Sequence, residues 1–178
     1  KTCMDNVREK ALLVHNITNY VTVNDVANVL LACGGSPIMS DEPDDVEDIT
    51  SICVGLNINI GTLNKRTIES MFLAGKKSKA LGHVLLLDPV GAGASKLRTE
   101  TAVKILDELK PDVIRGNISE IKTLALGRGT TRGVDADVAD AVTESTLGTA
   151  VTFSHNLAAK PGSIHRLPGA FDLFGNAE

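Results

Sequence analysis

Short apolar runs alternate with longer segments of helical periodicity along most of the chain. The short runs predict strands at residues 12–14, 37–39, 56–60, 84–87, 111–114 and 164–167. The longer segments predict helices at residues 26–31, 46–52, 65–81, 99–109, 118–126 and 137–159. Because strands that alternate with helices through short connections favour a parallel sheet with right-handed crossovers, we predict a three-layer α/β fold with a mostly parallel central sheet.

The composition supports this fold and narrows the classes of function. Of the 178 residues, 43% are hydrophobic but only 3% are aromatic, with no Trp. The core must therefore be aliphatic, as is typical of parallel strands that helices cover, and the run at residues 84–87 predicts a strand buried on both faces. The net charge of −4 argues against nucleic acid or an acidic membrane as the main partner.

The cysteines and the N-terminal residues bear on the cellular compartment. Cys3, Cys33 and Cys53 are an odd number and form no CxxC pair, so neither a disulfide framework nor a zinc site is expected. Residues 1–10 are charged throughout and carry no apolar stretch like that of a signal peptide, and no apolar run is long enough to span a bilayer. We therefore expect a cytoplasmic protein with no membrane partner.

Polar, glycine and carboxylate residues repeatedly follow the predicted strands. These segments are residues 15–19, residue 39, residues 59–62, residues 88–94 and residues 115–120. In open α/β sheets, ligands bind beyond the carboxyl ends of the strands. The repetition therefore predicts a functional site at this edge of the sheet.

Two readings are open for most of the candidate residues. Asp88 ends an apolar strand, where it could hold a metal or water or cap the following turn, and the glycines behind it could approach an anion or simply form a turn. Asn117 and Glu120 have the spacing of a capping box, although Glu120 could also lie beside a hydrated Mg²⁺. Arg115 could bind phosphate or form a surface salt bridge.

Two further features have a structural interpretation. Residues 41–48 contain six carboxylates but lack the alternating ligands and glycine of a calcium loop, so they are typical of a solvated helix start. His15 is interpreted as a hydrogen-bonded structural residue rather than a catalyst.

Taken together, five segments resemble the hydroxyethylthiazole kinase family of the ribokinase-like superfamily. They are residues 14–21, 35–39, 59–62, 88–94 and 115–120, and their order and spacing match over about residues 8–136. The resemblance implies a phosphotransferase that uses ATP and Mg²⁺ to phosphorylate the alcohol of 4-methyl-5-(2-hydroxyethyl)thiazole in thiamine biosynthesis or salvage. It also implies a homotrimer with the thiazole pocket at a subunit interface.

The resemblance assigns roles to particular residues. The thiazole would contact Asn19 and the backbone of Met39, with Gly61 and Thr62 nearby. Mg²⁺ would be held by Asp88 and Glu120, directly or through water. The ATP site would include Arg115, Asn117 and Pro168. These roles suit phosphoryl transfer, which depends mostly on positioning and on charge neutralisation.

The sequence departs from the family pattern in two places. Pro168 stands where the family has a Thr, and this change removes a hydroxyl and a backbone N–H. The chain ends at Glu178, before the glycine-rich segment that carries the family's anion hole and catalytic base, so we assign no catalytic residue.

From these departures we expect a single ribokinase-like domain over residues 1–178 that lacks its C-terminal part. Little or no kinase activity would follow, because losing anion-hole donors alone typically costs about 10²–10³ in kcat. The alternatives are an inactive thiazole-binding or trimer-assembly protein, or a remnant without a ligand.

Overall fold

A computed structural model describes residues 2–126, 164–167 and 173–175 of the chain. By their internal contacts the residues separate into two compact units, Lys1–Leu85 and Leu86–Glu178. The boundary falls within strand β4 (Val84–Asp88), and each unit is described by itself. Neither unit contains, among these described residues, a helix long and apolar enough to cross a membrane.

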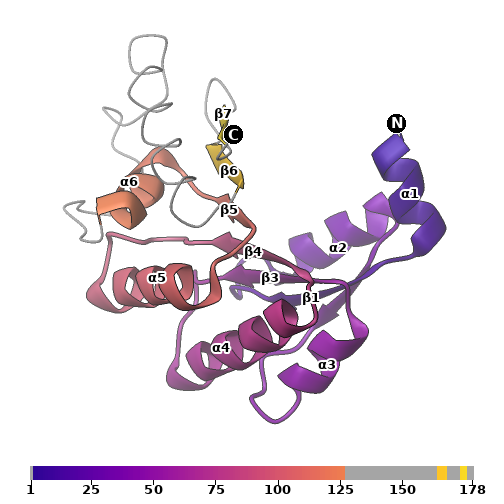
Figure 1. The fold of residues 1–178 in the computed structure, drawn as a ribbon, viewed down its shortest axis with the longest axis horizontal. Coiled ribbons are helices and arrows are strands. Elements are labelled where there is room, and N and C mark those ends of the chain that lie inside the picture. The colour runs from indigo at the N-terminus through magenta and orange to yellow at the C-terminus, as the bar shows by residue number, and fades with distance from the viewer. Residues whose placement is uncertain (1, 127–163, 168–172, 176–178) are drawn as a thin grey trace. The chain divides into compact units, whose positions relative to one another are not determined.

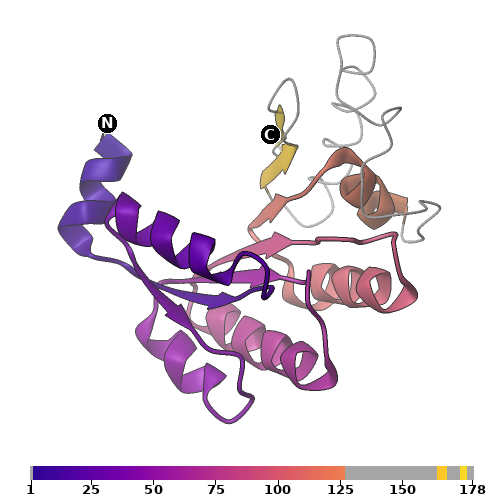
Figure 2. The same cartoon turned by 180° about the vertical axis from the view of Figure 1, so that it is seen from behind.

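The first unit is a parallel sheet with helices on both faces. Its strands are β1 (Leu13–Ile17), β2 (Ser36–Met39) and β3 (Gly55–Asn59), and its helices are α1 (Thr2–Lys10), α2 (Val23–Cys33), α3 (Val46–Ile52) and α4 (Lys65–Ala80). The strand order is β2-β1-β3, and both pairings are parallel. Figures 1 and 2 show α2 on one face of these strands and α3 and α4 on the other, which confirms the predicted three layers.

The second unit continues the same pattern with a shorter described part. Its elements after β4 are α5 (Lys96–Leu109), β5 (Val113–Arg115), α6 (Ile118–Leu126), β6 (Ile164–Leu167) and β7 (Leu173–Gly175). Strands β4, β5 and β6 pair in parallel, whereas β7 pairs antiparallel with β6. The sheet is therefore mostly parallel, as predicted, with one antiparallel strand that the sequence pattern did not indicate.

Local sequence explains where most helices begin and end. The Asn64 side chain accepts from the backbone N–H of Thr67 at 3.0 Å, and the Asn64 N–H donates to the Thr67 hydroxyl at 2.9 Å, so α4 begins with a reciprocal cap. Helix α2 ends at Gly34, whose φ of 91° is the left-handed conformation that glycine adopts without strain.

Two details differ from the sequence prediction, and one predicted helix is not tested. Helix α5 begins at Lys96 rather than near Thr99, because the Ser95 hydroxyl accepts from the backbone N–H of Arg98 at 3.3 Å and caps the helix earlier. Helix α1 was not predicted, since its charged sequence offers little apolar periodicity. The helix predicted over residues 137–159 lies outside the described residues.

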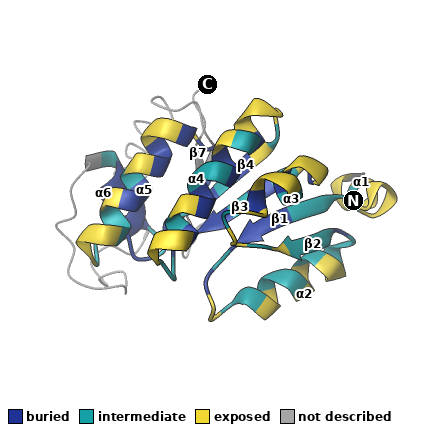
Figure 3. Ribbon diagram, turned by 90° about the horizontal axis from the view of Figure 1, so that it is seen from below, coloured by how far each residue is buried: buried dark blue, intermediate teal, exposed yellow. Residues whose placement is uncertain are grey.

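The described core is aliphatic, as the composition predicts. In the first unit Ile17, Leu56 and Ile58 are almost fully buried, and in the second Leu87 and Ile105 are. Strand β4 is buried at Leu85 and Leu87, whereas Leu86 on the other face is only half-buried and Val84 is exposed, so the prediction of burial on both faces was wrong. Helix α2 contains no fully buried residue (Figure 3).

Candidate functional site

The turn after β1 is organised by the side chain of Asn19. Its Oδ1 accepts from the backbone N–H groups of Val21 and Thr22 at 2.9 and 3.0 Å. Its Nδ2 donates to Oδ1 of Asn59 at 3.0 Å, and both side chains are buried. Asn19, which the resemblance places at the thiazole, therefore fixes the β1–α2 turn and ties it to the end of β3.

Gly61 and Thr62 lie against the same turn. The Gly61 N–H donates to Oδ1 of Asn59 at 2.9 Å, and a Cβ at Gly61 would come within 2.9 Å of both the Asn19 Cβ and the Asn59 Oδ1. The backbone N–H of Tyr20 donates to the Thr62 hydroxyl at 3.3 Å. The structure thus brings Asn19, Gly61 and Thr62 together, and only glycine fits at position 61.

Met39 lines a small cavity at the carboxyl ends of β1 and β2. The cavity has a volume of about 130 Å³ and is lined by Asn16, Thr18, Tyr20, Val23, Met39, Ser40 and Asp41. The hydroxyl of Thr18 is buried and has no hydrogen-bond partner among the described residues. The cavity therefore offers a mixed apolar and polar lining, of the kind that small-molecule sites use.

The predicted structural role of His15 is confirmed. Its ring is fully buried, with Nδ1 2.9 Å from the Thr50 hydroxyl and Nε2 2.9 Å from the Ser40 carbonyl oxygen. Burial lowers the pKa of His15, and the Ser40 carbonyl and Asp45 oppose that shift only in part. The ring is therefore held neutral between β1, α3 and the segment after β2.

In the second unit, Asp88 and Arg115 lie at the ends of neighbouring parallel strands and form an ion pair. Nη1 of Arg115 donates to Oδ2 of Asp88 at 3.1 Å. The Asp88 side chain is mostly buried, whereas that of Arg115 is about half-exposed. The structure thus shows the salt-bridge interpretation of Arg115 and leaves the exposed side of its guanidinium open to a ligand.

Glu120 ties two loops of the second unit together. Its Oε2 accepts from the Asn117 N–H at 2.8 Å, and the Asn117 Oδ1 accepts from the Glu120 N–H at 2.9 Å, so the predicted capping box is present. Its Oε1 accepts from the Gly91 N–H at 2.9 Å. Burial raises the pKa of Glu120, the two backbone N–H groups lower it, and the nearby charge of Asp88 raises it further.

The glycine loop after Asp88 forms a turn rather than an open anion cradle. The N–H groups of Gly91 and Gly93 donate to Glu120 and to the Thr99 hydroxyl. Those of Ala92 and Ala94 donate to carbonyls of the same loop, at Pro89 and Gly91. Gly91 and Gly93 have φ of 75° and 96°, so the turn itself requires glycine. Of the two readings that the sequence left open for this loop, the structure shows the turn.

The donor set of Asp88 and Glu120 fits a hydrated Mg²⁺. The two carboxylates lie near each other, because Asp88 ends β4 and Glu120 accepts from the Gly91 N–H in the loop that follows it. Mg²⁺ is usually held by one or two carboxylates and several waters, and no cluster of three metal-ligating side chains occurs in the described residues. Two carboxylates at one edge are thus sufficient for Mg²⁺ and too few for an all-protein cage.

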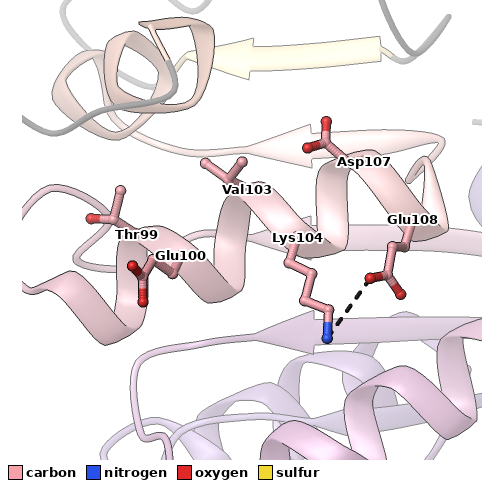
Figure 4. Close-up of a pocket in the computed structure, with 6 residues that line it drawn as sticks. All are labelled: Thr99, Glu100, Val103, Lys104, Asp107 and Glu108. Carbon is pink, nitrogen blue, oxygen red and sulfur yellow. Dashed lines mark ion pairs between the residues drawn. The ribbon is translucent and has the colours of Figure 1, made fainter.

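The remaining predicted features belong neither to the cavity of the first unit nor to the charged side chains of the second. Pro168 lies outside the described residues, and the acidic residues before α3 are mostly exposed, as expected of a solvated helix start. A hollow of about 280 Å³ lies along α5, and Lys104, one of its lining residues, pairs with Glu108 at 3.7 Å. Figure 4 shows the side chains that line it. None of the predicted site residues lines this hollow.

Sequence reasoning missed several residues of the cavity in the first unit. Asn16, Thr18 and Asp41 line it, although none was singled out as a ligand. The position of Asp41 shortly after the end of a parallel strand was the one available signal, but Asp41 belongs to a run of exposed carboxylates that hides it. Whether Asp41 faces solvent or the cavity depends on how the chain after β2 packs against the rest of the unit, which the sequence pattern does not show.

Comparison with known proteins gives a consistent result. The model of the hydroxyethylthiazole kinase family matches residues 4–178. The hydroxyethylthiazole kinase of Clostridium acetobutylicum is 60% identical over 176 residues, which cover 99% of this chain and 64% of that protein. That of Ruminiclostridium cellulolyticum is 51% identical over 175 residues, with 98% and 63% covered. The chain thus spans under two thirds of the length of these relatives.

Solved structures agree with the fold. The hydroxyethylthiazole kinase protein of Pyrococcus horikoshii OT3 is 35% identical with a TM-score of 0.84, covering 97% of this chain and 61% of that one. The pyridoxal kinase of Staphylococcus aureus is 14% identical with a TM-score of 0.59, covering 94% of this chain and 70% of that one. The predicted ribokinase-like fold is confirmed.

Proposed function

Because this chain belongs to the hydroxyethylthiazole kinase family, we propose that it serves the ATP-dependent phosphorylation of the alcohol of 4-methyl-5-(2-hydroxyethyl)thiazole, in thiamine biosynthesis or salvage. The observation that carries the proposal is the cavity at the carboxyl ends of β1 and β2, where Met39 meets the turn that follows β1. Its lining combines apolar side chains with a few polar groups, as small-molecule sites do.

In this proposal the first unit holds the thiazole. The backbone of Met39 and the turn organised by Asn19 supply polar contacts, and Gly61 and Thr62 support that turn. Because Asn19 already bonds to Asn59 within the chain, the turn keeps its shape without the substrate. A preformed turn reduces the ordering cost of binding.

The second unit holds the nucleotide and the metal. Arg115 and Asn117 would contact ATP, and Asp88 and Glu120 would hold Mg²⁺, directly or through water. The metal would supply positive charge that neutralises the phosphates of ATP. Charge on the transferred phosphoryl group is further balanced by the half-exposed guanidinium of Arg115, which can turn from Asp88 to a phosphate oxygen.

The assembled protein is proposed to be a cytoplasmic homotrimer. Apolar side chains on and just before α2 are exposed, at Tyr20, Val21, Val29 and Leu31. Exposed apolar surface is where a subunit interface is expected, so these side chains are its candidates. Cys3, Cys33 and Cys53 are free, as a reducing compartment requires. Sedimentation equilibrium tests the assembly: a mass of three chains is expected, and a monomer would contradict it.

The test of the function is a kinase assay on the purified protein, which also decides between this proposal and the low activity that the sequence alone led us to expect. ATP and Mg²⁺ are supplied with 4-methyl-5-(2-hydroxyethyl)thiazole or, for comparison, with pyridoxal, the ligand of the Staphylococcus aureus structure. Mass spectrometry of the products should show the phosphorylated thiazole alcohol and a strong preference for the thiazole. A folded protein that phosphorylates neither compound, or that prefers pyridoxal, would overturn the proposal.

A further inference from the structure

The segment that follows β2 is held from inside the first unit by two buried side chains. Nε2 of His15, in β1, donates to the carbonyl oxygen of Ser40 at 2.9 Å. The hydroxyl of Ser70, in α4, donates to the carbonyl oxygen of Asp41 at 2.7 Å, with the Arg66 carbonyl of its own helix a longer second acceptor at 3.0 Å. Both side chains have no exposed surface. Two successive carbonyl groups are thus fixed from two different elements.

The His15 ring must donate, not accept, in its hydrogen bond to Ser40. A carbonyl oxygen only accepts, so Nε2 carries the hydrogen. Burial lowers the pKa of His15, so the ring is neutral at neutral pH and Nδ1 is left as an acceptor 2.9 Å from the Thr50 hydroxyl, whose hydrogen also has the Val46 carbonyl oxygen within reach at 2.7 Å. Thr50 is itself fully buried in α3. The ring is therefore oriented by α3 and holds the Ser40 carbonyl in one place.

The remaining side-chain contacts of this segment lie on the surface. The Ser40 hydroxyl donates to Oδ2 of Asp45 at 2.6 Å, and Glu42 pairs with Arg66, and both contacts are exposed. Exposed ion pairs usually contribute little because water and salt screen them. The buried bonds from His15 and Ser70 therefore dominate the position of the segment.

This segment forms one wall of the cavity. Met39, Ser40 and Asp41 line it opposite the turn after β1. Neither His15 nor Ser70 lines it. A change at either side chain can thus reach a ligand only through the backbone that it holds.

We propose that His15 and Ser70 are positioning residues: through the Ser40 and Asp41 carbonyls they set the Met39–Asp41 wall of the cavity and thereby the affinity for the thiazole alcohol. This inference rests on the proposed function. Neither side chain touches the substrate, so the effect falls on thiazole binding and leaves ATP binding unchanged.

The chain offers a matched control in the same helix. Ser78 is also in α4 and fully buried, but its hydroxyl has no hydrogen-bond partner among the described residues. Ser70→Ala and Ser78→Ala therefore remove the same buried group, and only the first releases a carbonyl of the cavity wall. His15→Gln keeps an amide that can donate to Ser40 and accept from Thr50, whereas His15→Leu keeps neither.

The measurement is calorimetric titration with 4-methyl-5-(2-hydroxyethyl)thiazole, together with steady-state kinetics. Loss of one buried hydrogen bond predicts a roughly tenfold rise in thiazole Kd and KM for Ser70→Ala, with the KM for ATP unchanged. His15→Leu should show a rise at least as large, His15→Gln should recover most of it, and Ser78→Ala should match the wild type. Unchanged thiazole affinity in Ser70→Ala, or an equal loss in Ser78→Ala, would overturn the proposal.

A second readout separates this proposal from the proposed function. Hydrogen exchange of the peptide containing residues 39–42 should be faster in Ser70→Ala and His15→Gln or His15→Leu than in Ser78→Ala, without any ligand. If the wild type binds thiazole but this exchange does not change, the positioning role alone is wrong. A wild type that binds no thiazole overturns the function and the positioning role that rests on it, even where the exchange shows that the wall is held.

Discussion

The two units of the chain prepare their predicted binding groups in different ways. In the first unit, the turn after β1 and the wall after β2 are held by buried hydrogen bonds from Asn59, His15 and Ser70. In the second, Asp88 and Arg115 hold each other in a partly exposed pair. The binding groups of the first unit thus keep their positions when a ligand binds. In the second unit, Asp88 and Arg115 must break their ion pair before either can bind a ligand fully.

This difference has an energetic consequence. A preformed cavity spends little binding energy on ordering its own backbone. When Asp88 or Arg115 binds a ligand, it first loses its contact with the other. The binding free energy therefore includes only the difference between the new contact and the lost one. Substitutions in the first unit should therefore act on stability and thiazole affinity together, and those at Asp88 or Arg115 should act mainly on ATP and Mg²⁺.

The largest expected effect is on catalysis, from Asp88→Asn. The substitution keeps the shape of the side chain but removes the charge proposed to hold Mg²⁺, and a loss of about 10²-fold or more in kcat/KM for ATP is expected. Initial rates at varied Mg²⁺ measure it, with the thiazole Kd unchanged. Asp107→Asn, on the exposed face of α5, is the control. A rate for Asp88→Asn that equals that of the control would contradict the assignment.

The next effect is on the stability of the first unit, from Gly61→Ala. The new Cβ would come within 2.9 Å of the Asn19 Cβ and must push the turn from β3, at a cost of about 1–3 kcal/mol in the free energy of unfolding. Gly55→Ala is the matched control, because its Cβ would approach only the Val84 carbonyl, at 3.4 Å. Urea unfolding should rank Gly61→Ala below Gly55→Ala, and the reverse order would count against the tight turn.

A comparable effect is expected in the second unit from Glu120→Ala. Removing the carboxylate leaves the buried N–H groups of Gly91 and Asn117 without their acceptor, which costs about 1–3 kcal/mol. Glu100→Ala removes an exposed carboxylate paired with Lys96 and should cost under about 0.5 kcal/mol. Equal unfolding midpoints for the two variants would show that Glu120 does not tie the loops together.

The smallest effect is the dependence of stability on pH that His15 contributes. Burial lowers the pKa of His15 below its ordinary value of 6.5, so between these two values the unfolded chain binds more protons than the folded one. The contribution of neutral His15 to the free energy of unfolding is therefore fully present above about pH 6.5. It is lost as the pH falls through the pKa that His15 has in the folded protein. Urea midpoints of the wild type should fall more on acidification than those of His15→Gln. Identical pH profiles would rule out this contribution.

Sequence patterns predicted the elements well where they are strongly apolar or well capped. Helix α6 at Ile118–Leu126 and strand β6 at Ile164–Leu167 lie where the pattern placed them. Helix α1 escaped because its residues are mostly charged, and β7 because it has only three residues. Such short or polar elements depend on contacts with the rest of the chain, which periodicity does not record.

For the candidate site, the sequence pattern predicted which residues lie there but not which side chains they bond to. The carboxyl ends of parallel strands pointed to Asn19, Asp88 and Glu120, because the fold places such residues at one edge. The partner of Asn19 is 40 residues away in the chain, and that of Asp88 is 27 residues away. These pairings depend on strand register and helix packing. Whether such a side chain bonds to a ligand or to another part of the protein therefore cannot be decided from the sequence pattern.

Hydrogen exchange of the whole chain with and without 4-methyl-5-(2-hydroxyethyl)thiazole, in the absence of ATP, tests the central claim most directly. The account predicts that the thiazole protects the peptides containing Thr18–Tyr20 and Met39–Asp41, which line the cavity of the first unit. Peptides containing Asp88, Arg115 and Glu120 should exchange as before. Protection confined to these latter peptides, or none anywhere at saturating thiazole, would contradict the account.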